Sequence, residues 1–258
     1  MAVIKNILIF HQQGLEVLVP YMVEAISEVM NCFPQYKDMF PIKNMGNWAS
    51  PNARMVHEGH NYLCPYESIE WYIERAKERA TREGRWPDRG QISIDQMFND
   101  LNEDPYFKRI PQWGIYLTKH DLYGGGANRF CLGCTRPDGF SVISIRRLLD
   151  RQNHLNLENF QTVVQHEFGH ILRLTEGDRP NTRYYLGEHC TDPNCIMQQR
   201  EDGDFSDVTE RRLERKAKGL PPICPDCIIQ GRQMLSGLCA AYERKFNPNT
   251  PGHGGGRG

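Results

Sequence analysis

The sequence predicts a fold that mixes helices and strands, of the α+β or α/β class. The chain has 258 residues, and 39% of them are hydrophobic, so it can bury a sizeable core as one large domain or two small lobes. Its first segment, VIKNILIF at 3–10, is rich in Ile and Val and is typical of a strand. The next segment, EVLVPYMVEAISEVM at 16–30, repeats apolar residues along one helical face. A strand followed by an amphipathic helix indicates the start of an α/β layer.

Further elements are expected along the chain. Residues 34–66 carry four prolines and are expected to form an irregular surface excursion. A charged amphipathic helix is predicted over 67–84, ending at Gly84, and another over 92–104, capped by Ser93. Strand patterns then follow at 113–123, 128–134 and 139–149.

Charge and cysteine usage limit the classes of function. Lys+Arg total 31 and Asp+Glu total 32, a net charge of -1, which speaks against a general nucleic-acid binder. No run approaches the roughly 18 apolar residues of a membrane-spanning helix, and no signal-peptide pattern is visible, so a cytoplasmic protein is expected. In that setting the nine cysteines favour metal binding over disulfides. Six of them fall in short pairs, namely Cys131/Cys134, Cys190/Cys195 and Cys224/Cys227.

The segment NLENFQTVVQHEFGHILRL at 156–174 predicts a buried helix with a metal-binding face. His166 and His170 are four residues apart, so they lie on one face and can chelate one ion. Glu167 lies beside them, where its carboxylate can take a proton from a zinc-activated water that attacks a carbonyl. The spacing therefore predicts a zinc site of the hydrolytic kind, with Glu167 as general base.

A catalytic zinc takes three protein ligands and keeps one position open. Three residues downstream are candidates for the third ligand: Glu176, Asp178 and His189. Zinc favours imidazole, and a metal bound by the adjacent Cys190 would hold His189 in a fixed place. We therefore expect His189 as the third ligand, with Glu176 as the next choice.

The cysteines after this helix supply a second ligand set. Two short pairs together offer four thiolates, which suit a closed tetrahedral zinc. Four motifs follow one another along the chain: His166-Glu167-x-x-His170, His189-Cys190, Cys195-Ile196-Met197 and Cys224-x-x-Cys227. In this order they resemble the archaemetzincins, a branch of the metzincin metallopeptidases. The likeness extends upstream to RGQISIDQMFNDL, LTKHDLYGGGANRF and GFSVISIRRL.

The resemblance implies a metzincin-like catalytic domain. Its fold would be a twisted, mostly parallel sheet with an antiparallel edge strand, a long zinc-binding helix and a small irregular C-terminal lobe. The resemblance implies two zinc ions per chain, one catalytic and one structural, and places Met197 in the turn beneath the catalytic one. The domain would cover 1–245, with an upper lobe over 1–177, a lower lobe over 178–245, a surface excursion over 34–88, and a disordered Gly-rich tail over 246–258.

The resemblance also implies a strand along which an extended peptide substrate pairs by backbone hydrogen bonds. The residues expected in that strand are Arg129, Phe130, Cys131, Leu132 and Gly133. Cys131 and Cys134 are interpreted as strand and turn residues, because neither has an obvious second pair with which to hold a metal.

Two departures from the family pattern concern the third ligand and the cysteines. The family has a Gly three residues after the second His, which ends the helix, whereas this chain has Arg173. We therefore expect the helix to continue to near Gly177, with 178–188 acting as an insertion that returns His189 to the site. The second departure is a longer interval after Met197, which the charged helix DVTERRLERKAKG fills.

The predicted function is that of a monomeric zinc metallopeptidase acting on peptides or proteins, without nucleic-acid or membrane partners. The alternative is a zinc-stapled module that binds peptides without cutting them, motivated by Arg173 and the distant His189. A zinc-ribbon nucleic-acid binder built on the cysteine pairs is a third hypothesis, against which the neutral charge speaks.

Overall fold

The structure is a computed structural model of the chain. It describes residues 3–47, 54–57, 60–63, 69–86, 88–104, 112–124, 130–137, 139–177, 179–184, 187–199 and 205–246. Three predictions fall outside these residues: the tail from 247 onward, Asp178 as a ligand, and Arg129 in the substrate strand.

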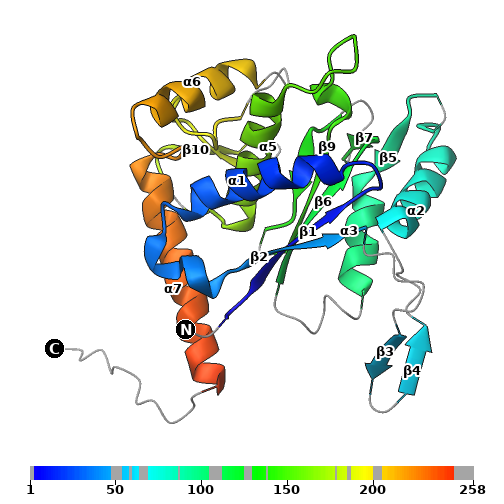
Figure 1. The fold of residues 1–258 in the computed structure, drawn as a ribbon, viewed down its shortest axis with the longest axis horizontal. Coiled ribbons are helices and arrows are strands. Elements are labelled where there is room, and N and C mark those ends of the chain that lie inside the picture. The colour runs from blue at the N-terminus through cyan, green and yellow to red at the C-terminus, as the bar shows by residue number, and fades with distance from the viewer. Residues whose placement is uncertain are drawn as a thin grey trace.

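A five-stranded sheet forms the centre of the fold (Figure 1). β1 pairs in parallel with β2 and β6, and β6 pairs in parallel with β9. β8 runs antiparallel to β9 and forms one edge. The predicted mostly parallel sheet with an antiparallel edge strand is therefore confirmed. In the spatial order β2-β1-β6-β9-β8, the strands are Ile42–Gly46, Asn6–His11, Gln112–Thr118, Phe140–Ser144 and Gly133–Thr135.

Helices cover both faces of this sheet, which explains the continuous apolar run of β1. Ile7 and Ile9 belong to a core shared with α1 and α5, whereas Leu8 and Phe10 belong to a second core shared with α2 and α3. Successive strand residues point to opposite faces, so a strand buried on both sides needs apolar residues at every position. The four helices are α1 (Val19–Met30), α2 (Ile69–Arg82), α3 (Ile94–Glu103) and α5 (Leu157–Ile171).

The predicted helices over 67–84 and 92–104 are confirmed as α2 and α3. The predicted cap of α3 is also present, because the Ser93 hydroxyl accepts a hydrogen bond from the backbone N–H of Gln96 at 3.3 Å. Two short strands, β5 (Gln91–Ser93) and β7 (Asp121–Tyr123), form a separate parallel pair. Two short 3-10 helices precede longer helices in the chain: η1 (Glu16–Leu18) comes before α1, and η3 (Arg146–Leu148) comes before α5.

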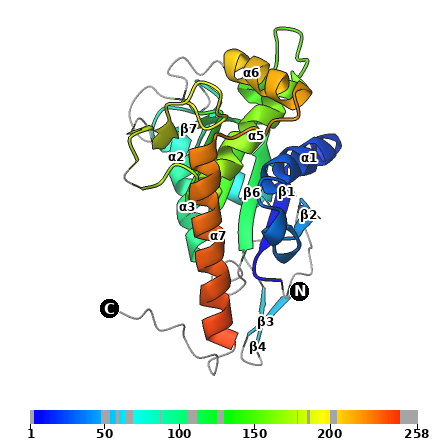
Figure 2. The same cartoon turned by 90° about the vertical axis from the view of Figure 1, so that its left-hand side faces the viewer.

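The prediction of a surface excursion over 34–88 is wrong for most of its described residues. β2 is a strand of the central sheet, and α2 lies in the second core. Phe40 is buried and stacks on Trp113, with ring centroids 5.0 Å apart. The prolines mark boundaries of short elements here, since Pro34 begins η2 (Pro34–Met39) and Pro41 directly precedes β2. Only the hairpin of β3 (Arg54–His57) and β4 (His60–Leu63) lies apart from the sheet in Figures 1 and 2.

α5 ends at Ile171, so the longer helix expected from the missing glycine is wrong. Arg173 itself takes the left-handed conformation, with φ of 54°. The backbone N–H of Arg173 donates to the carbonyl of His170, and that of Leu174 donates to the carbonyl of Gly169, both at 3.0 Å. This pair of bonds is the Schellman motif, which usually has glycine at the left-handed position. The chain therefore turns back where the family glycine would turn it.

The C-terminal part contains a hairpin and two helices. β10 (Thr182–Tyr184) and β11 (Glu188–Cys190) pair antiparallel, and α6 (Ser206–Ala217) confirms the predicted charged helix. α7 (Pro225–Phe246) was not predicted, and its buried residues are only Cys227, Gly231 and Leu235. It runs past the sheet toward the lower end of the molecule in Figure 2. Among the described residues, no helix combines the length and apolar character needed to cross a membrane.

Candidate metal centres

Three histidines converge at the end of α5. Nε2 of His170 lies 3.2 Å from Nε2 of His166 and 3.1 Å from Nε2 of His189. Zinc–nitrogen distances of about 2.0–2.1 Å separate the ligand atoms of a tetrahedral site by ~3.3–3.4 Å. Two of the three nitrogen pairs therefore have nearly the spacing that a single zinc requires, and the ligand atoms of all three residues lie within 4.8 Å of one another. The structure thus brings the predicted third residue, His189, to the other two.

Hydrogen bonds at the second ring nitrogen orient two of these imidazoles. Nδ1 of His166 lies 2.7 Å from the carbonyl oxygen of Ile196, and Nδ1 of His189 lies 3.1 Å from that of Gly187. Because Nδ1 donates to a carbonyl, the lone pair is left on Nε2, which faces the other histidines. Burial lowers the pKa of His166 to about 3 and holds that of His170 well below its usual range. The rings of His166 and His170 are thus in the neutral form that binds metal.

Glu167 lies beside this cluster with 7% of its surface exposed. The hydroxyl of Thr135 donates to Oε2 of Glu167 at 2.5 Å. Gly133 packs against the same side chain, since a Cβ on Gly133 would lie 2.6 Å from the carboxyl carbon. Burial raises the pKa of Glu167 to about 7, and the hydrogen bond from Thr135 opposes that rise. A carboxyl group with such a pKa can both accept and return a proton near neutral pH.

Met197 lies against the helix between the two histidines of α5. It is fully buried, and a Cβ on Gly169 would lie 2.2 Å from its Sδ. Its carbonyl oxygen accepts a hydrogen bond from the backbone N–H of Cys190 at 2.9 Å, and Ile196 just before it orients His166. The turn at Met197 therefore lies next to the histidine cluster and joins it to the first cysteine.

Four buried cysteines form the second cluster. Sγ of Cys190 lies 3.7 Å from Sγ of Cys224, and Sγ of Cys195 lies 3.7 Å from Sγ of Cys227. Zinc–sulfur distances of about 2.3 Å give a tetrahedron of thiolates with edges of ~3.8 Å, so one zinc fits. All four thiols are free, and their ligand atoms all lie within 4.8 Å of one another.

Hydrogen bonds from neighbouring groups surround these sulfurs, as expected for thiolates. The backbone N–H of Asp192 donates to Sγ of Cys190 at 3.4 Å, and the guanidinium of Arg179 donates to Sγ of Cys227 at 3.6 Å. Donors such as these stabilise a thiolate, which is the form in which cysteine binds metal, so this environment fits a structural zinc.

The remaining candidates that the structure describes do not join either cluster. Glu176, the next choice for the third ligand, forms an ion pair with Arg173 at 3.3 Å instead. Cys131 and Cys134 have their sulfurs 3.3 Å apart but belong to no group of three or more ligands among the described residues. Thr135 was missed from the sequence, because its contact with Glu167 links residues that are 32 positions apart and leaves no local pattern.

Comparison with known proteins adds sequence and fold similarity to this geometry. No family model matches the chain. Over 82 residues it is 38% identical to an archaemetzincin of Methanopyrus kandleri. It also resembles the crystal structure of archaemetzincin from that organism with a TM-score of 0.55 and 21% identity, over 90% of this chain and 96% of that one. The chain has the archaemetzincin fold.

The extent of the archaemetzincin likeness differs between sequence and structure. The 82 aligned residues are 31% of this chain and 39% of the M. kandleri relative, so the match spans less than half the length of that protein. A zinc-dependent peptidase from Methanocorpusculum labreanum is similar with a TM-score of 0.45 and 16% identity, over 87% of this chain and 99% of that one.

Within the archaemetzincin fold, the expected substrate strand is shifted along the chain. We predicted it over residues 129–133, whereas the edge strand β8 covers Gly133–Thr135, so only Gly133 is common to both. Cys131 forms a single antiparallel bridge to Leu122 instead, and the chain bends at Leu132 before β8 begins. Phe130 precedes the bridge and is 37% exposed. The bend lets the chain leave Leu122 and pair with β9, so a pattern of strand-forming residues alone gives the wrong bounds.

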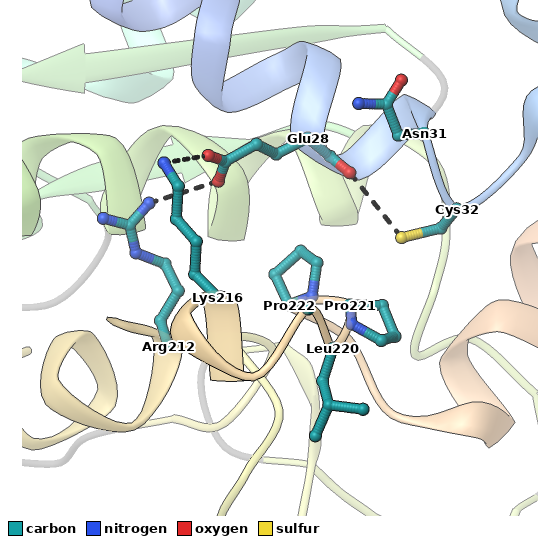
Figure 3. Close-up of a pocket in the computed structure, with 9 residues that line it drawn as sticks. Glu28, Asn31, Cys32, Arg212, Lys216, Leu220, Pro221 and Pro222 are labelled. Atoms are coloured by element: carbon teal, nitrogen blue, oxygen red, sulfur yellow. Dashed lines mark hydrogen bonds and ion pairs between the residues drawn. The ribbon is translucent and has the colours of Figure 1, made fainter. Parts of the chain in front are cut away.

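A separate pocket of about 370 Å³ lies between the end of α1 and the end of α6 (Figure 3). The carboxylate of Glu28 pairs there with Lys216 at 2.5 Å and with Arg212 at 3.5 Å. It also accepts a hydrogen bond at 2.5 Å from the amide of Gln165, the residue before His166. No lining residue belongs to either metal cluster. These polar contacts tie α1 and α6 to the helix that carries the histidines.

Proposed function

We propose that the chain is a zinc-dependent peptidase that hydrolyses peptide bonds of peptides or proteins. The observation that carries this proposal is the convergence of three imidazole Nε2 atoms, 3.1 and 3.2 Å apart, beside the buried carboxyl group of Glu167. Three imidazoles leave one position of a tetrahedral zinc open, as a catalytic site requires. The sequence similarity to the M. kandleri archaemetzincin supports the same class of activity.

His166, His170 and His189 would hold the catalytic zinc. A zinc ion there would acidify a water molecule and polarise the carbonyl of the peptide bond. The chain's own part is to present the three rings, two of which, those of His166 and His189, are buried and oriented by backbone carbonyls. Such rings lose little freedom when the metal binds, because hydrogen bonds and packing already restrict them.

Glu167 is the residue we assign to proton transfer. Its carboxylate takes the proton of the attacking water and then delivers it to the departing amine, as a general base followed by a general acid. Thr135 holds one carboxyl oxygen, and Gly133 leaves the space that the side chain occupies. The carboxyl group is therefore held in a defined place rather than in bulk solvent, on the residue that directly follows the ligand His166.

The four cysteines Cys190, Cys195, Cys224 and Cys227 would hold a structural zinc. That zinc would link β11 to the start of α7. Because His189 directly precedes Cys190 on β11, a fixed Cys190 also fixes His189 at the first cluster. The proposal therefore includes two zinc ions with different duties, one for chemistry and one for the position of a ligand.

β8 is proposed as the strand on which the substrate lies. Among the described strands its one neighbour in the sheet is β9, and we propose that its other edge pairs with an extended peptide by backbone hydrogen bonds. Gly133 and Thr135 of β8 contact Glu167, which puts a peptide on that edge close to the general base. A single catalytic domain over 1–245, a monomeric state and a cytoplasmic location remain predictions of the same proposal.

The test compares the zinc-loaded protein with its Glu167→Gln variant, using zinc analysis and mass spectrometry of a mixed peptide library. The wild type should contain two zinc ions per chain and cleave peptides. Glu167→Gln should retain both ions and lose cleavage by ~10²–10⁴-fold, because the amide cannot accept the proton. Glu176→Gln is the matched control, since Glu176 lies outside both clusters, and it should cleave normally.

Three results would contradict parts of the proposal. Undiminished cleavage by Glu167→Gln would show that another group transfers the proton. A wild type that holds both zinc ions and binds library peptides but does not cut them would instead support a peptide-binding module. His189→Ala should lose one zinc ion per chain; if it keeps both, His189 is not a ligand.

A further inference from the structure

Cys131 and Cys134 are the one cysteine pair that the two metal clusters do not use. The thiol of Cys134 donates a hydrogen bond to Sγ of Cys131, and the two sulfurs are 3.3 Å apart. Both residues are partly exposed. Among the described residues no third metal-binding side chain completes a site with them. The pair is therefore available for chemistry between its own two sulfurs.

The backbone on either side of the bend holds the two thiols together. The N–H of Cys131 donates to the carbonyl of Leu122 at 3.1 Å, and the carbonyl of Leu132 accepts from the N–H of Ser144 at 2.8 Å. Cys134 lies inside β8, which pairs with β9. In a regular extended strand, residues three apart point to opposite faces, so their thiols would not meet. The bend at Leu132 is what brings them to one side.

We infer that Cys131 and Cys134 form an oxidisable dithiol site, which low-molecular-weight disulfides such as oxidised glutathione convert reversibly into an intramolecular disulfide. One cysteine thiolate attacks the glutathione disulfide, forming a mixed disulfide and releasing one glutathione. The second cysteine then attacks the protein sulfur and releases the other glutathione. The two thiols together lose two protons and two electrons, and one glutathione disulfide becomes two glutathione molecules.

Disulfide formation between Cys131 and Cys134 requires little movement. A disulfide bond is about 2.05 Å long, so the sulfurs must approach by ~1.2 Å, which side-chain rotation with a small backbone shift can supply. The hydrogen bond from Cys134, together with burial, raises the pKa of Cys131. Thiolate is the attacking species, so the exchange should be faster in alkaline buffer than at neutral pH.

The other described cysteines differ from this pair. Cys32 donates to the carbonyl of Glu28 at 3.7 Å, and Cys239 contacts the sulfur of Met39 at 3.7 Å; neither has a cysteine neighbour among the described residues. Lone thiols can form a mixed disulfide with glutathione but cannot resolve it. The four clustered cysteines are buried and, with zinc bound, are held as metal ligands.

The location of the pair connects its oxidation to the proposed peptidase, and this step rests on that function. Gly133 lies between the two cysteines, where a single added Cβ would be 2.6 Å from the carboxyl carbon of Glu167. Thr135, the next residue after Cys134, donates to the same carboxyl group. Closing the disulfide tightens the segment that contacts Glu167 on two sides. Because a misplacement of about 1 Å can cost ~10²-fold in rate, we expect oxidation to lower turnover by roughly tenfold.

The experiment incubates the zinc-loaded full-length protein in oxidised or in reduced glutathione, followed by alkylation and tryptic mapping. The tryptic peptide 130–146 contains both cysteines and no others. In oxidised glutathione it should lose two hydrogen masses and take up no alkyl group, and dithiothreitol should reverse this. Cys134→Ser is the matched control, which should give only a glutathione adduct on Cys131. A peptide that remains a dithiol, or one that carries glutathione in the wild type, would overturn the site.

Turnover of a cleaved library peptide and zinc content are measured on the same samples. Wild-type turnover should fall roughly tenfold on oxidation while zinc content stays constant. In Cys131→Ser/Cys134→Ser the ratio of oxidised to reduced turnover should be about 1, whatever its basal rate. A disulfide that forms without a change in turnover overturns the link to Glu167. If the reduced wild type cleaves nothing, the proposed peptidase function is refuted but the dithiol site is not. The peptide mapping tests for the disulfide without any peptidase activity.

Discussion

Replacing Arg173 tests whether the turn after α5 carries the strain of a non-glycine residue. Arg173 has φ of 54°, and the left-handed conformation costs an L-residue ~1–2 kcal/mol. Glycine adopts this conformation without that cost. The unfolded state of a glycine variant is more flexible, however, which offsets ~0.5–1 kcal/mol of the gain in folded-state stability. Arg173→Gly should therefore be more stable than Arg173→Ala by about 1 kcal/mol. Both variants lose the same side chain, so their difference isolates the backbone.

The side chain of Arg173 makes a small separate contribution. Its guanidinium lies 3.3 Å from the carboxylate of Glu176, and the two side chains are 42% and 35% exposed. Ion pairs this exposed to solvent contribute less than ~0.5 kcal/mol. Arg173→Ala should therefore lie slightly below the wild type in stability, and Arg173→Gly slightly above it.

Thermal and urea unfolding of the three zinc-loaded proteins, at one zinc concentration, measure these differences. For a chain of this length 1 kcal/mol corresponds to about 2–4 °C in Tm. The expected order of Tm is Gly, then Arg, then Ala. Equal stability of the glycine and alanine variants would show that Arg173 carries no backbone strain.

Three other changes test the site and its surroundings. Gly169→Ala should destabilise by ~1–3 kcal/mol in urea unfolding, although alanine usually favours a helix, because its Cβ would lie 2.2 Å from Sδ of Met197; a stabilised variant would show that Met197 moves aside freely. Gly133→Ala should lower kcat by ~10–10²-fold with zinc content unchanged, by displacing Glu167; an unchanged kcat would contradict that contact. Chelation of zinc, or Cys224→Ser, should lower the unfolding free energy by several kcal/mol if the cysteines hold a structural zinc; a Cys224→Ser variant with unchanged zinc content and unchanged unfolding free energy would exclude that site.

Local spacing was enough to predict the helix-borne part of the candidate site. His166 and His170 lie one turn apart whenever the segment is helical, and the apolar pattern of 156–174 makes it helical. The cysteine pairs are similarly defined by short separations. In contrast, the contact of Thr135 with Glu167 joins a strand to a helix, and no periodicity in either segment indicates it.

The excursion and the substrate strand show where pattern reasoning fails. Residues 42–46 form a strand because β1 offers them a free edge, whereas their own composition is unremarkable for a strand. The bounds of β8 depend on the bend at Leu132, which long-range hydrogen bonds to Leu122 and Ser144 stabilise. Such pairing partners are set by the packed sheet, so a single segment cannot report them.

Residue types and their spacing along the chain define the groups available for chemistry: an imidazole pair, a carboxyl group between them, and downstream histidine and cysteine residues sufficient for two metal sites. Which downstream residue meets the imidazole pair depends on tertiary contacts. Glu176 follows the turn at Arg173 and faces away into an ion pair, whereas the pairing of Arg183 with His189 returns His189 to α5. Helical geometry follows from local dihedral angles, but the closure of a loop of 18 intervening residues between His170 and His189 depends on contacts made by the whole fold.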